Sequence, residues 1–251
     1  FELFFEGDPL TEAHEKDMSR LASDMQISRA RFANRYLSTD DVIADISCGS
    51  GYLSELLRFK TYYGVDHPEM VAMIADSGMH QRSSVVFVPH DFEDGTDLSL
   101  SEEMDKIVSF ETIEHLEDPE RFLHNIGRNL RTGGQLILST PNNPFNDPPR
   151  YSYHVREYSL KEMHSMLTDS GFDVTGSYTM GVPFELARRA LESTHIKTYR
   201  ADPSGERGTL SKVMDYVRPL RRLYCAVLPY STLGINIGDS GSGMILVSSK
   251  R

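Results

Sequence analysis

The sequence predicts an α/β fold in which seven strands form a doubly wound, mostly parallel sheet. Three observations lead to this fold class. Short apolar runs alternate with amphipathic segments, glycines follow the first run, and acidic residues end several runs. Strands that alternate with helices are typical of doubly wound sheets, which bind ligands at the carboxyl ends of their strands. The 251 residues, 39% of them hydrophobic, are enough for one such domain.

Seven short runs rich in apolar residues are predicted as strands. Parallel strands in the middle of a sheet are buried on both faces, so their sequences are nearly continuous apolar runs. The predicted strands are Asp41–Ile46, Thr61–Val65, Ser83–Pro89, Lys106–Phe110, Gln135–Thr140, Phe172–Tyr178 and Met244–Ser248.

Four segments between these runs carry helix signals, which are capping residues or an apolar stripe. The predicted helices begin at Tyr52, Pro68, Asp118 and Ser159. Asp118 is a suitable N-cap before Pro119, and Ser159 with Glu162 forms a capping box. The pair Gly133-Gly134 is expected to end the third helix.

We expect a single domain with two additions to its sheet. Residues 1–38 are predicted as a helical cover, 39–181 as the ligand-binding core, 182–240 as a helical insert or lid, and 241–251 as the last strand. The insert lies between the sixth and seventh strands. Its two expected helices cover Glu185–Lys197 and Ser211–Leu228.

The charge balance disfavours a nucleic-acid partner. Lys and Arg total 26 against 37 Asp and Glu, a net charge of −11 with His neutral. Proteins that bind phosphate backbones need a basic face that releases counterions. No apolar run approaches the ~20 residues of a membrane-spanning helix, so we also expect no membrane partner.

The cysteine content indicates a reducing compartment. Cys48 and Cys225 are too few for a disulfide framework. The segment Phe1–Glu6 lacks the basic and apolar regions of a secretory signal. We therefore expect a cytoplasmic protein.

A glycine loop, Gly49-Ser50-Gly51, lies between the first predicted strand and helix, where backbone can approach a ligand closely. A dinucleotide-binding fingerprint would place a third glycine at position 54, which is Ser54. A nicotinamide-dependent dehydrogenase is therefore disfavoured. A tight turn with no ligand is the plain alternative.

Four acidic residues mark the ends of the first four strands: Asp45, Asp66, Asp91 and Glu111. Asp66 lies 21 residues after Asp45, which is the range in which a carboxylate meets a ribose diol. An ionised carboxylate only accepts hydrogen bonds, so it suits the two hydroxyl donors of a diol.

These segments resemble the class I S-adenosylmethionine-dependent methyltransferases, and in particular the ubiquinone-biosynthesis-like small-molecule branch. The resemblance spans about residues 25–180. It is carried by five segments: residues 45–52, His90-Asp91-Phe92, residues 110–119, 130–142, and Arg29-Ala30-Arg31-Phe32-Ala33. It implies a Rossmann-like sheet whose last strand is antiparallel, with S-adenosylmethionine as cofactor and S-adenosylhomocysteine as product.

The resemblance also implies roles for particular residues. Gly49 and Gly51 would leave room for the methionine moiety, Asp66 would bind the ribose, and Asp91 the adenine amino group beside Phe92. The full predicted cofactor set is Arg29, Asp45, Cys48, Gly49, Gly51, Asp66, His67, Asp91, Phe92, Phe110 and Glu111. For Cys48, a small residue packed in a tight turn is the simpler interpretation.

Methyl transfer to a hydroxyl benefits from a positioned base, for which histidine is the usual choice. His115 is the first candidate and His154 the second. A structural role for His115, such as bonding a backbone carbonyl, is an equal alternative. The predicted acceptor-binding residues are His14, Glu114, Tyr151, Tyr153 and Arg156. His115 could pair with Glu111, but no third ligand is recognisable, so we expect no metal.

The sequence therefore predicts methyl transfer to a small molecule, with an oxygen acceptor favoured over nitrogen. A sugar, a sugar phosphate or a secondary-metabolite intermediate would be suitable acceptors. A basic cluster in the insert favours an anionic acceptor, although a solvated helix face explains it as well: Arg188, Arg189, Arg218, Arg221 and Arg222. An N-methyltransferase, an NAD(P)-dependent oxidoreductase and a non-catalytic binding module are the alternatives. The oligomeric state is open, with a homodimer as one option.

Overall fold

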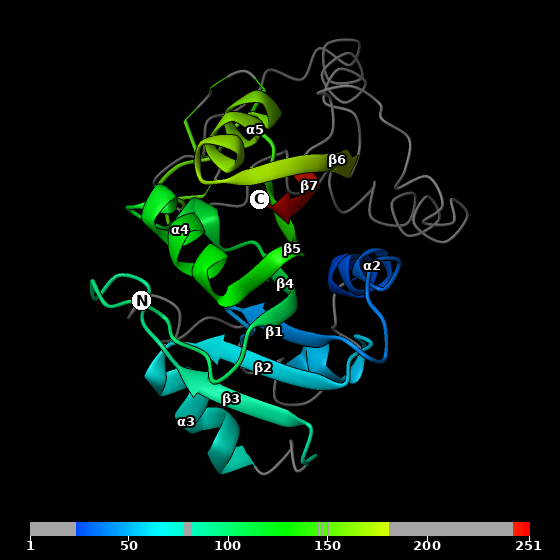
Figure 1. The fold of residues 1–251 in the computed structure, drawn as a ribbon. Helices are drawn as coiled ribbons and strands as arrows, with labels where there is room; N and C mark the ends of the chain where they lie inside the picture. The colour runs from blue at the N-terminus through cyan, green and yellow to red at the C-terminus, as the bar shows by residue number, and fades with distance from the viewer. Residues whose placement is uncertain (1–23, 78–81, 145, 147, 150, 181–242) are drawn as a thin grey trace.

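The computed structural model describes residues 24–77, 82–144, 146, 148–149, 151–180 and 243–251. Its centre is a seven-stranded sheet in the order β3-β2-β1-β4-β5-β7-β6 (Figure 1). The strands are β1 Val42–Ile46, β2 Thr61–Asp66, β3 Val85–Pro89, β4 Met104–Phe110, β5 Leu130–Pro141, β6 Phe172–Met180 and β7 Gly243–Lys250. All neighbours are parallel except β7, which is antiparallel to both β5 and β6. The predicted fold class is confirmed.

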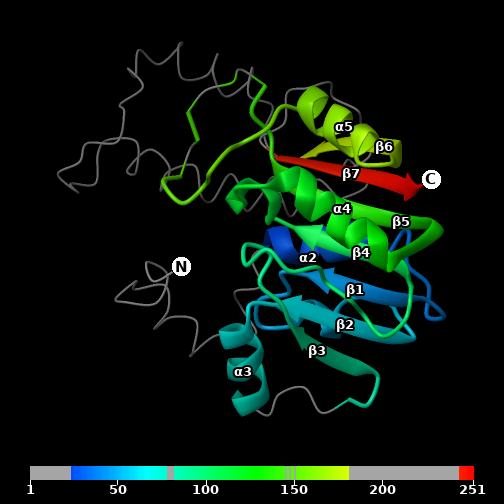
Figure 2. The ribbon, with the colours of Figure 1, turned by 60° about the vertical axis from the view of Figure 1, so that its left-hand side comes forward.

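Helices cover both faces of the sheet. The α-helices are α2 Asp24–Ala33, α3 Pro68–Ser77, α4 Pro119–Asn129 and α5 Leu160–Asp169. In Figure 2, α4 and α5 lie in front of the strands and α2 lies behind them. The predicted caps are confirmed, because the Asp118 side chain accepts a hydrogen bond from the Arg121 backbone and the Ser159–Glu162 capping box is complete.

Two predicted boundaries are wrong. The segment after the glycine loop forms only a short 3₁₀ helix, Tyr52–Glu55. Helix α4 ends at Asn129, and Leu130 already has extended backbone and pairs with Met104 of β4. Gly133 and Gly134 therefore lie within β5. Strand pairing begins at the buried Leu130, and this ends the helix earlier than the two glycines would.

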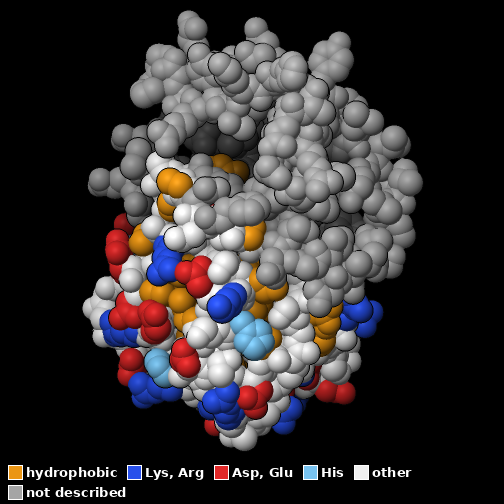
Figure 3. Space-filling model, turned by 90° about the horizontal axis from the view of Figure 1, so that it is seen from above, with side chains coloured by type: hydrophobic (Ala, Val, Ile, Leu, Met, Phe, Trp, Pro, Cys, Tyr) orange, Lys and Arg blue, Asp and Glu red, His pale blue; other side chains and the backbone are white. Residues whose placement is uncertain are grey.

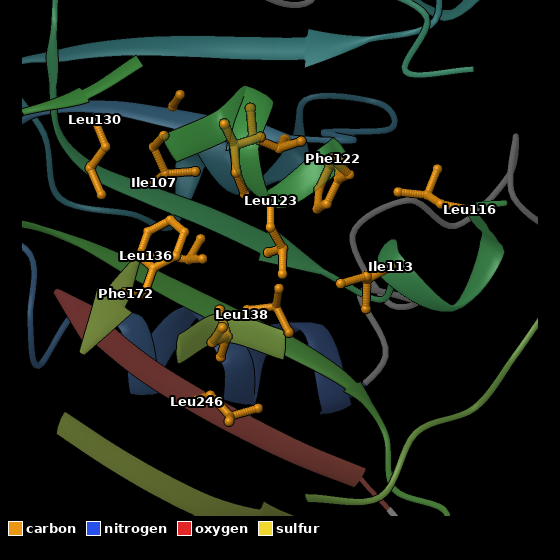
Figure 4. Close-up of a cluster of buried hydrophobic side chains, with 14 of the residues drawn as sticks. Ile107, Ile113, Leu116, Phe122, Leu123, Leu130, Leu136, Leu138, Phe172 and Leu246 are labelled. Carbon is orange, nitrogen blue, oxygen red and sulfur yellow. The ribbon is translucent and has the colours of Figure 1, made fainter. Parts of the chain in front are cut away.

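Two hydrophobic clusters pack on the two faces of the sheet. The cluster beneath α4 and α5 contains the side chains labelled in Figure 4: Ile107, Ile113, Leu116, Phe122, Leu123, Leu130, Leu136, Leu138, Phe172 and Leu246. The other cluster joins α2 to the opposite face through Ala30, Phe32, Ala33, Ile43, Val108, Ile137 and Ile245. Burial on both faces explains the continuous apolar runs of the central strands.

The expected helices of the insert and its arginine cluster lie outside the described residues, as do His14, Cys225 and most of the helical cover at 1–38. The division into one domain with these parts therefore stays a prediction. Among the described helices, none has both the length and the apolar character that crossing a bilayer requires. Figure 3 shows Lys and Arg side chains interspersed with Asp and Glu over the described part of one face.

Candidate functional site

The glycine loop after β1 turns sharply at two glycines. Gly49 has φ +55° and Gly51 has φ +73°, a left-handed conformation that side chains with a Cβ rarely adopt. A Cβ built on Gly49 would meet no atom of the described residues within 4 Å. The loop therefore leaves open space beside its backbone, as a close ligand requires.

Asp66 holds this loop to the end of β2. Its Oδ2 accepts a hydrogen bond from the Gly49 N–H at 2.7 Å, and its Oδ1 accepts one from the His67 N–H at 2.7 Å. Burial raises the pKa of the Asp66 carboxyl, while these two backbone donors lower it. Each carboxylate oxygen has two lone pairs, so both oxygens can accept a further hydrogen bond from a ligand hydroxyl.

Asp45, a residue of the predicted cofactor set, lies in the core near the end of β1. Its side chain is within the core, with the residue 1% exposed, and its Oδ2 accepts a hydrogen bond from the Tyr62 hydroxyl at 2.5 Å. Burial raises the pKa of Asp45 to about 7, which the Tyr62 bond partly opposes. Burial also raises the pKa of the Cys48 thiol, which keeps that thiol protonated. In this structure both side chains form hydrogen bonds within the protein, Asp45 with Tyr62 and Cys48 with the Gly49 carbonyl.

The predicted adenine end lies after β3. Asp91 Oδ2 is 3.6 Å from Nε2 of His67, which follows β2. The half-buried Phe92 packs edge-on against Phe122 of α4, with ring centroids 5.0 Å apart, and against His90. The loops after β2 and β3 thus meet, as the parallel arrangement of these strands predicts.

An ion pair lies at the end of β4, at Glu111 of the predicted cofactor set. Glu111 Oε2 is 2.9 Å from the Arg29 Nη2 of α2, and Glu111 Oε1 accepts a hydrogen bond from Ser139 Oγ of β5 at 2.9 Å. The Glu111 backbone has φ +56° and donates to the Ser139 carbonyl. Arg29 Nε is buried without a hydrogen-bond partner among the described residues. Ser139 was missed in the sequence analysis. Its only signal in the sequence is its place as a small polar residue near the end of an apolar strand.

Glu114 connects the turn after β4 to the segment after β5. Its backbone carbonyl accepts hydrogen bonds from the N–H groups of Val155 and Arg156. The residue is 1% exposed, and its Oε2 accepts a hydrogen bond from Thr140 Oγ1 at 2.9 Å. Burial, and secondarily the charge of Glu111, raises the pKa of Glu114 to about 8. Glu114, a predicted acceptor-binding residue, is therefore buried and joins the turn after β4 to the segment after β5, and its contact with an acceptor stays a prediction.

The two candidate histidines meet at this junction. Their rings are perpendicular, with centroids 4.9 Å apart. His115 is half-buried, burial lowers its pKa, and its Nδ1 lies 3.1 Å from the Tyr153 carbonyl oxygen. His154 is buried, and its Nδ1 lies 2.8 Å from Oε1 of Glu157. Sequence reasoning missed Glu157, which lies three residues after His154.

Aromatic rings extend from the histidines to the surface. Tyr151 and Tyr153 are 52% and 47% exposed, and their rings stack at 5.2 Å with an interplanar angle of 13°. The Tyr153 ring in turn stacks on His115 at 5.7 Å. Arg156 is instead engaged with Glu162, whose Oε1 accepts a hydrogen bond from it at 2.6 Å. The predicted acceptor-binding residues Tyr151 and Tyr153 thus lie beside the histidines, whereas the Arg156 guanidinium is bound to Glu162 of α5.

The model of the methyltransferase domain family matches residues 18–177, which include most of the sheet and this site. The chain belongs to this methyltransferase family. It is 32% identical over 154 residues to a probable S-adenosylmethionine-dependent methyltransferase of Mycobacterium tuberculosis, covering 59% of this chain and 53% of that protein. It is 34% identical over 124 residues to the ubiquinone biosynthesis O-methyltransferase of Pseudomonas syringae, covering 47% and 51%. The chain thus spans about half the length of these curated relatives.

The fold of this methyltransferase-family chain is also similar to that of solved structures. A methyltransferase of Haloferax volcanii, solved in complex with the Trm112 activator, aligns with a TM-score of 0.58 over 95% of both chains. The two sequences are 18% identical, so this likeness shows the fold alone.

The residues present fit S-adenosylmethionine, the cofactor in the names of the mycobacterial relatives. The loop at Gly49 leaves open space, and Asp66 can accept from ribose hydroxyls. Arg29 and Glu111 offer opposite charges to the carboxylate and ammonium of an amino acid. The predicted residues other than His14 are described. Apart from Arg29 on α2, each lies near the carboxyl end of one of the strands β1 to β5 or in the segment that follows it.

The same junction brings together three residues that could hold a metal ion. One ligand atom from each of Glu114, His115 and His154 lies within 4.8 Å of the other two. The sequence-based expectation of no metal depended on the missing third ligand. In the structure His154 is the third candidate ligand, and Glu114 rather than Glu111 is the carboxylate beside His115.

Proposed function

We propose that this chain transfers a methyl group from S-adenosylmethionine to a hydroxyl oxygen of a small molecule. The observation that carries the proposal is the pair of perpendicular histidine rings beside the Arg29–Glu111 ion pair, at the carboxyl end of β4. One group of residues can therefore bind an amino-acid moiety while a neighbouring group removes a proton.

When bound, S-adenosylmethionine supplies a methyl group on a positively charged sulfur, which leaves as the neutral thioether of S-adenosylhomocysteine. The chain orients both reactants, since much of the acceleration in such a displacement comes from alignment and exclusion of water. A ring nitrogen of His115 or His154 takes the acceptor's hydroxyl proton. The oxygen electron pair then forms the new bond to carbon while the carbon–sulfur bond breaks.

The partly exposed side chains of Tyr151 and Tyr153 support acceptor binding at this junction. The O-methyltransferase names of the Pseudomonas relatives favour oxygen over nitrogen. A sugar, sugar phosphate or secondary-metabolite intermediate is the acceptor class we propose, with a nitrogen acceptor as the alternative. We further propose a cytoplasmic protein, with neither nucleic acid nor membrane as partner and a homodimer as one option for its assembly.

The test is a mass-spectrometric screen. The chain is incubated with S-adenosylmethionine and a panel of phenols, sugars, sugar phosphates and primary amines, and each product is analysed for the gain of one methyl group. Methylation confined to hydroxyl compounds is the expected result. Methylation of amines alone would replace the oxygen acceptor by nitrogen, and no methylation with any panel member would contradict the proposal for these acceptor classes.

A metal-assisted reaction is the second candidate, and the cluster Glu114, His115 and His154 favours it. A divalent cation there could polarise the acceptor oxygen, so that no histidine would need to act as base. Methyl transfer that is unchanged by a chelator supports the histidine base. Activity that a chelator abolishes and Mg²⁺ or Zn²⁺ restores would support the metal instead.

A further inference from the structure

Glu157 forms a buried pair with His154, one of the two candidate bases, and has itself no role in the proposed reaction. The Oε1 of Glu157 lies 2.8 Å from the Nδ1 of His154, and the two residues are 3% and 9% exposed. A buried carboxylate costs free energy unless it is hydrogen-bonded and paired, so this contact is one that the fold must maintain.

The partner atom decides where the imidazole carries its proton. An ionised carboxylate can only accept a hydrogen bond, so the Nδ1 of His154 must donate and carry the proton. In the neutral ring the lone pair is then on Nε2. The same reasoning applies to His115, because its Nδ1 contacts a backbone carbonyl, which also only accepts. The difference is charge: the Glu157 carboxylate stabilises a positively charged ring, whereas the Tyr153 carbonyl is neutral.

The surrounding residues fix the orientation of the His154 ring. It meets the rings of Tyr151, Tyr153 and His115 edge to face, with centroids 4.9 to 5.1 Å away. Its backbone N–H donates to the Tyr151 carbonyl. The Glu114 carbonyl binds the next two N–H groups of the chain, so the segment cannot turn the ring away without breaking these bonds.

We propose that Glu157 is a positioning residue that holds the proton of His154 on Nδ1 and thereby makes Nε2 of His154 the atom that receives the acceptor's proton. This ranks His154 above His115 as the base, against the order expected from sequence. The titratable groups around the ring are Glu157, Glu114, His115, Tyr151 and Tyr153, and Glu157 lies within hydrogen-bond distance of a ring nitrogen. The inference rests on the proposed function for its catalytic meaning, but the tautomer itself is independent of activity.

The experiment records the imidazole ¹⁵N spectrum of the ¹⁵N-histidine-labelled chain at pH about 8.5, well above the pKa of an ordinary histidine. The signals of His154 are assigned by their loss in His154→Asn. A protonated Nδ1 and an unprotonated Nε2 are the expected result. A proton on Nε2, in the other tautomer or in an imidazolium, would overturn the inference.

Glu157→Leu then removes the acceptor at similar volume. We expect a population of His154 with the proton on Nε2, whereas Asp173→Asn, which removes an exposed ion pair with Arg251, should leave the His154 signals unchanged. An unchanged tautomer in folded Glu157→Leu would show that Glu157 does not hold the proton. If that variant does not fold, the wild-type spectrum alone decides. Titration of the wild type with S-adenosylhomocysteine separately tests the proposed function, so the two failures are distinguishable.

Discussion

The backbone N–H of Gly49 donates a 2.7 Å hydrogen bond to the Asp66 carboxylate, which ties the glycine loop after β1 to the end of β2. One acidic side chain therefore shapes the loop and offers acceptor lone pairs to a ribose. We therefore expect removal of the Asp66 carboxylate to weaken cofactor binding.

Asp66→Ala should weaken the binding of S-adenosylhomocysteine by about 1–3 kcal/mol, because it removes a carboxylate acceptor and leaves the Gly49 N–H unpaired. Isothermal titration calorimetry measures this change. Asp173→Asn is the control and should bind like the wild type. Equal affinity in Asp66→Ala would remove Asp66 from the cofactor site.

Glu111→Gln should destabilise the fold, because it leaves the buried Arg29 guanidinium without its charged partner. Since Glu111 itself is partly exposed, we expect the free energy of unfolding to fall by about 1–3 kcal/mol. Urea denaturation measures it. Ser139→Ala removes one hydrogen bond to the same carboxylate and should cost less. A Glu111→Gln variant as stable as the wild type would mean that water replaces the interaction of Glu111 with the Arg29 guanidinium.

The raised pKa of Asp45 predicts that the free energy of unfolding depends on pH. Its pKa is raised to about 7 in the folded state, so the native state retains a proton that the unfolded state loses above pH about 4. This contribution favours folding at low pH and is lost progressively as pH rises toward 7. Asp45→Asn keeps an oxygen that can accept from Tyr62 but does not titrate.

Relative to the wild type, Asp45→Asn should therefore gain stability on the order of 2 kcal/mol between pH about 5 and pH about 8. Urea denaturation at both pH values provides the comparison, and Asp173→Asn should show no such gain. If the free energies of unfolding of Asp45→Asn and the wild type differ by the same amount at both pH values, Asp45 is ionised throughout this range in the folded protein.

His154→Asn should lower turnover by about 10²-fold or more, the usual contribution of a general base, with little change in S-adenosylhomocysteine affinity. His115→Asn should lower turnover less, because its Nδ1 partner is a neutral carbonyl. Steady-state kinetics with an acceptor from the screen measures both, and His124→Asn on the exposed side of α4 is the control. A larger loss in His115→Asn would reverse the ranking of the two histidines.

Local signals in the sequence predicted most of the fold. Apolar runs located the strands, and the caps at Asp118 and Ser159 located two helices, because both signals act within a few residues. The end of α4 was mispredicted because pairing between Leu130 and the distant Met104 decides it.

Partner choice within the site was less predictable. Ser139 reaches Glu111 from 28 residues away, and His154 meets His115 through the segment after β5. Such contacts depend on the order and register of β4 and β5, which the local pattern does not contain. The acidic residues at the strand ends were predictable because parallel strands bring their carboxyl ends to one edge.

We propose that this chain binds S-adenosylmethionine at the carboxyl edge of its sheet. Calorimetric titration of the wild-type chain with S-adenosylhomocysteine, and in parallel with NAD, tests it most directly. We expect saturable binding of S-adenosylhomocysteine at one site per chain and no binding of NAD. Binding of NAD without binding of S-adenosylhomocysteine would contradict it.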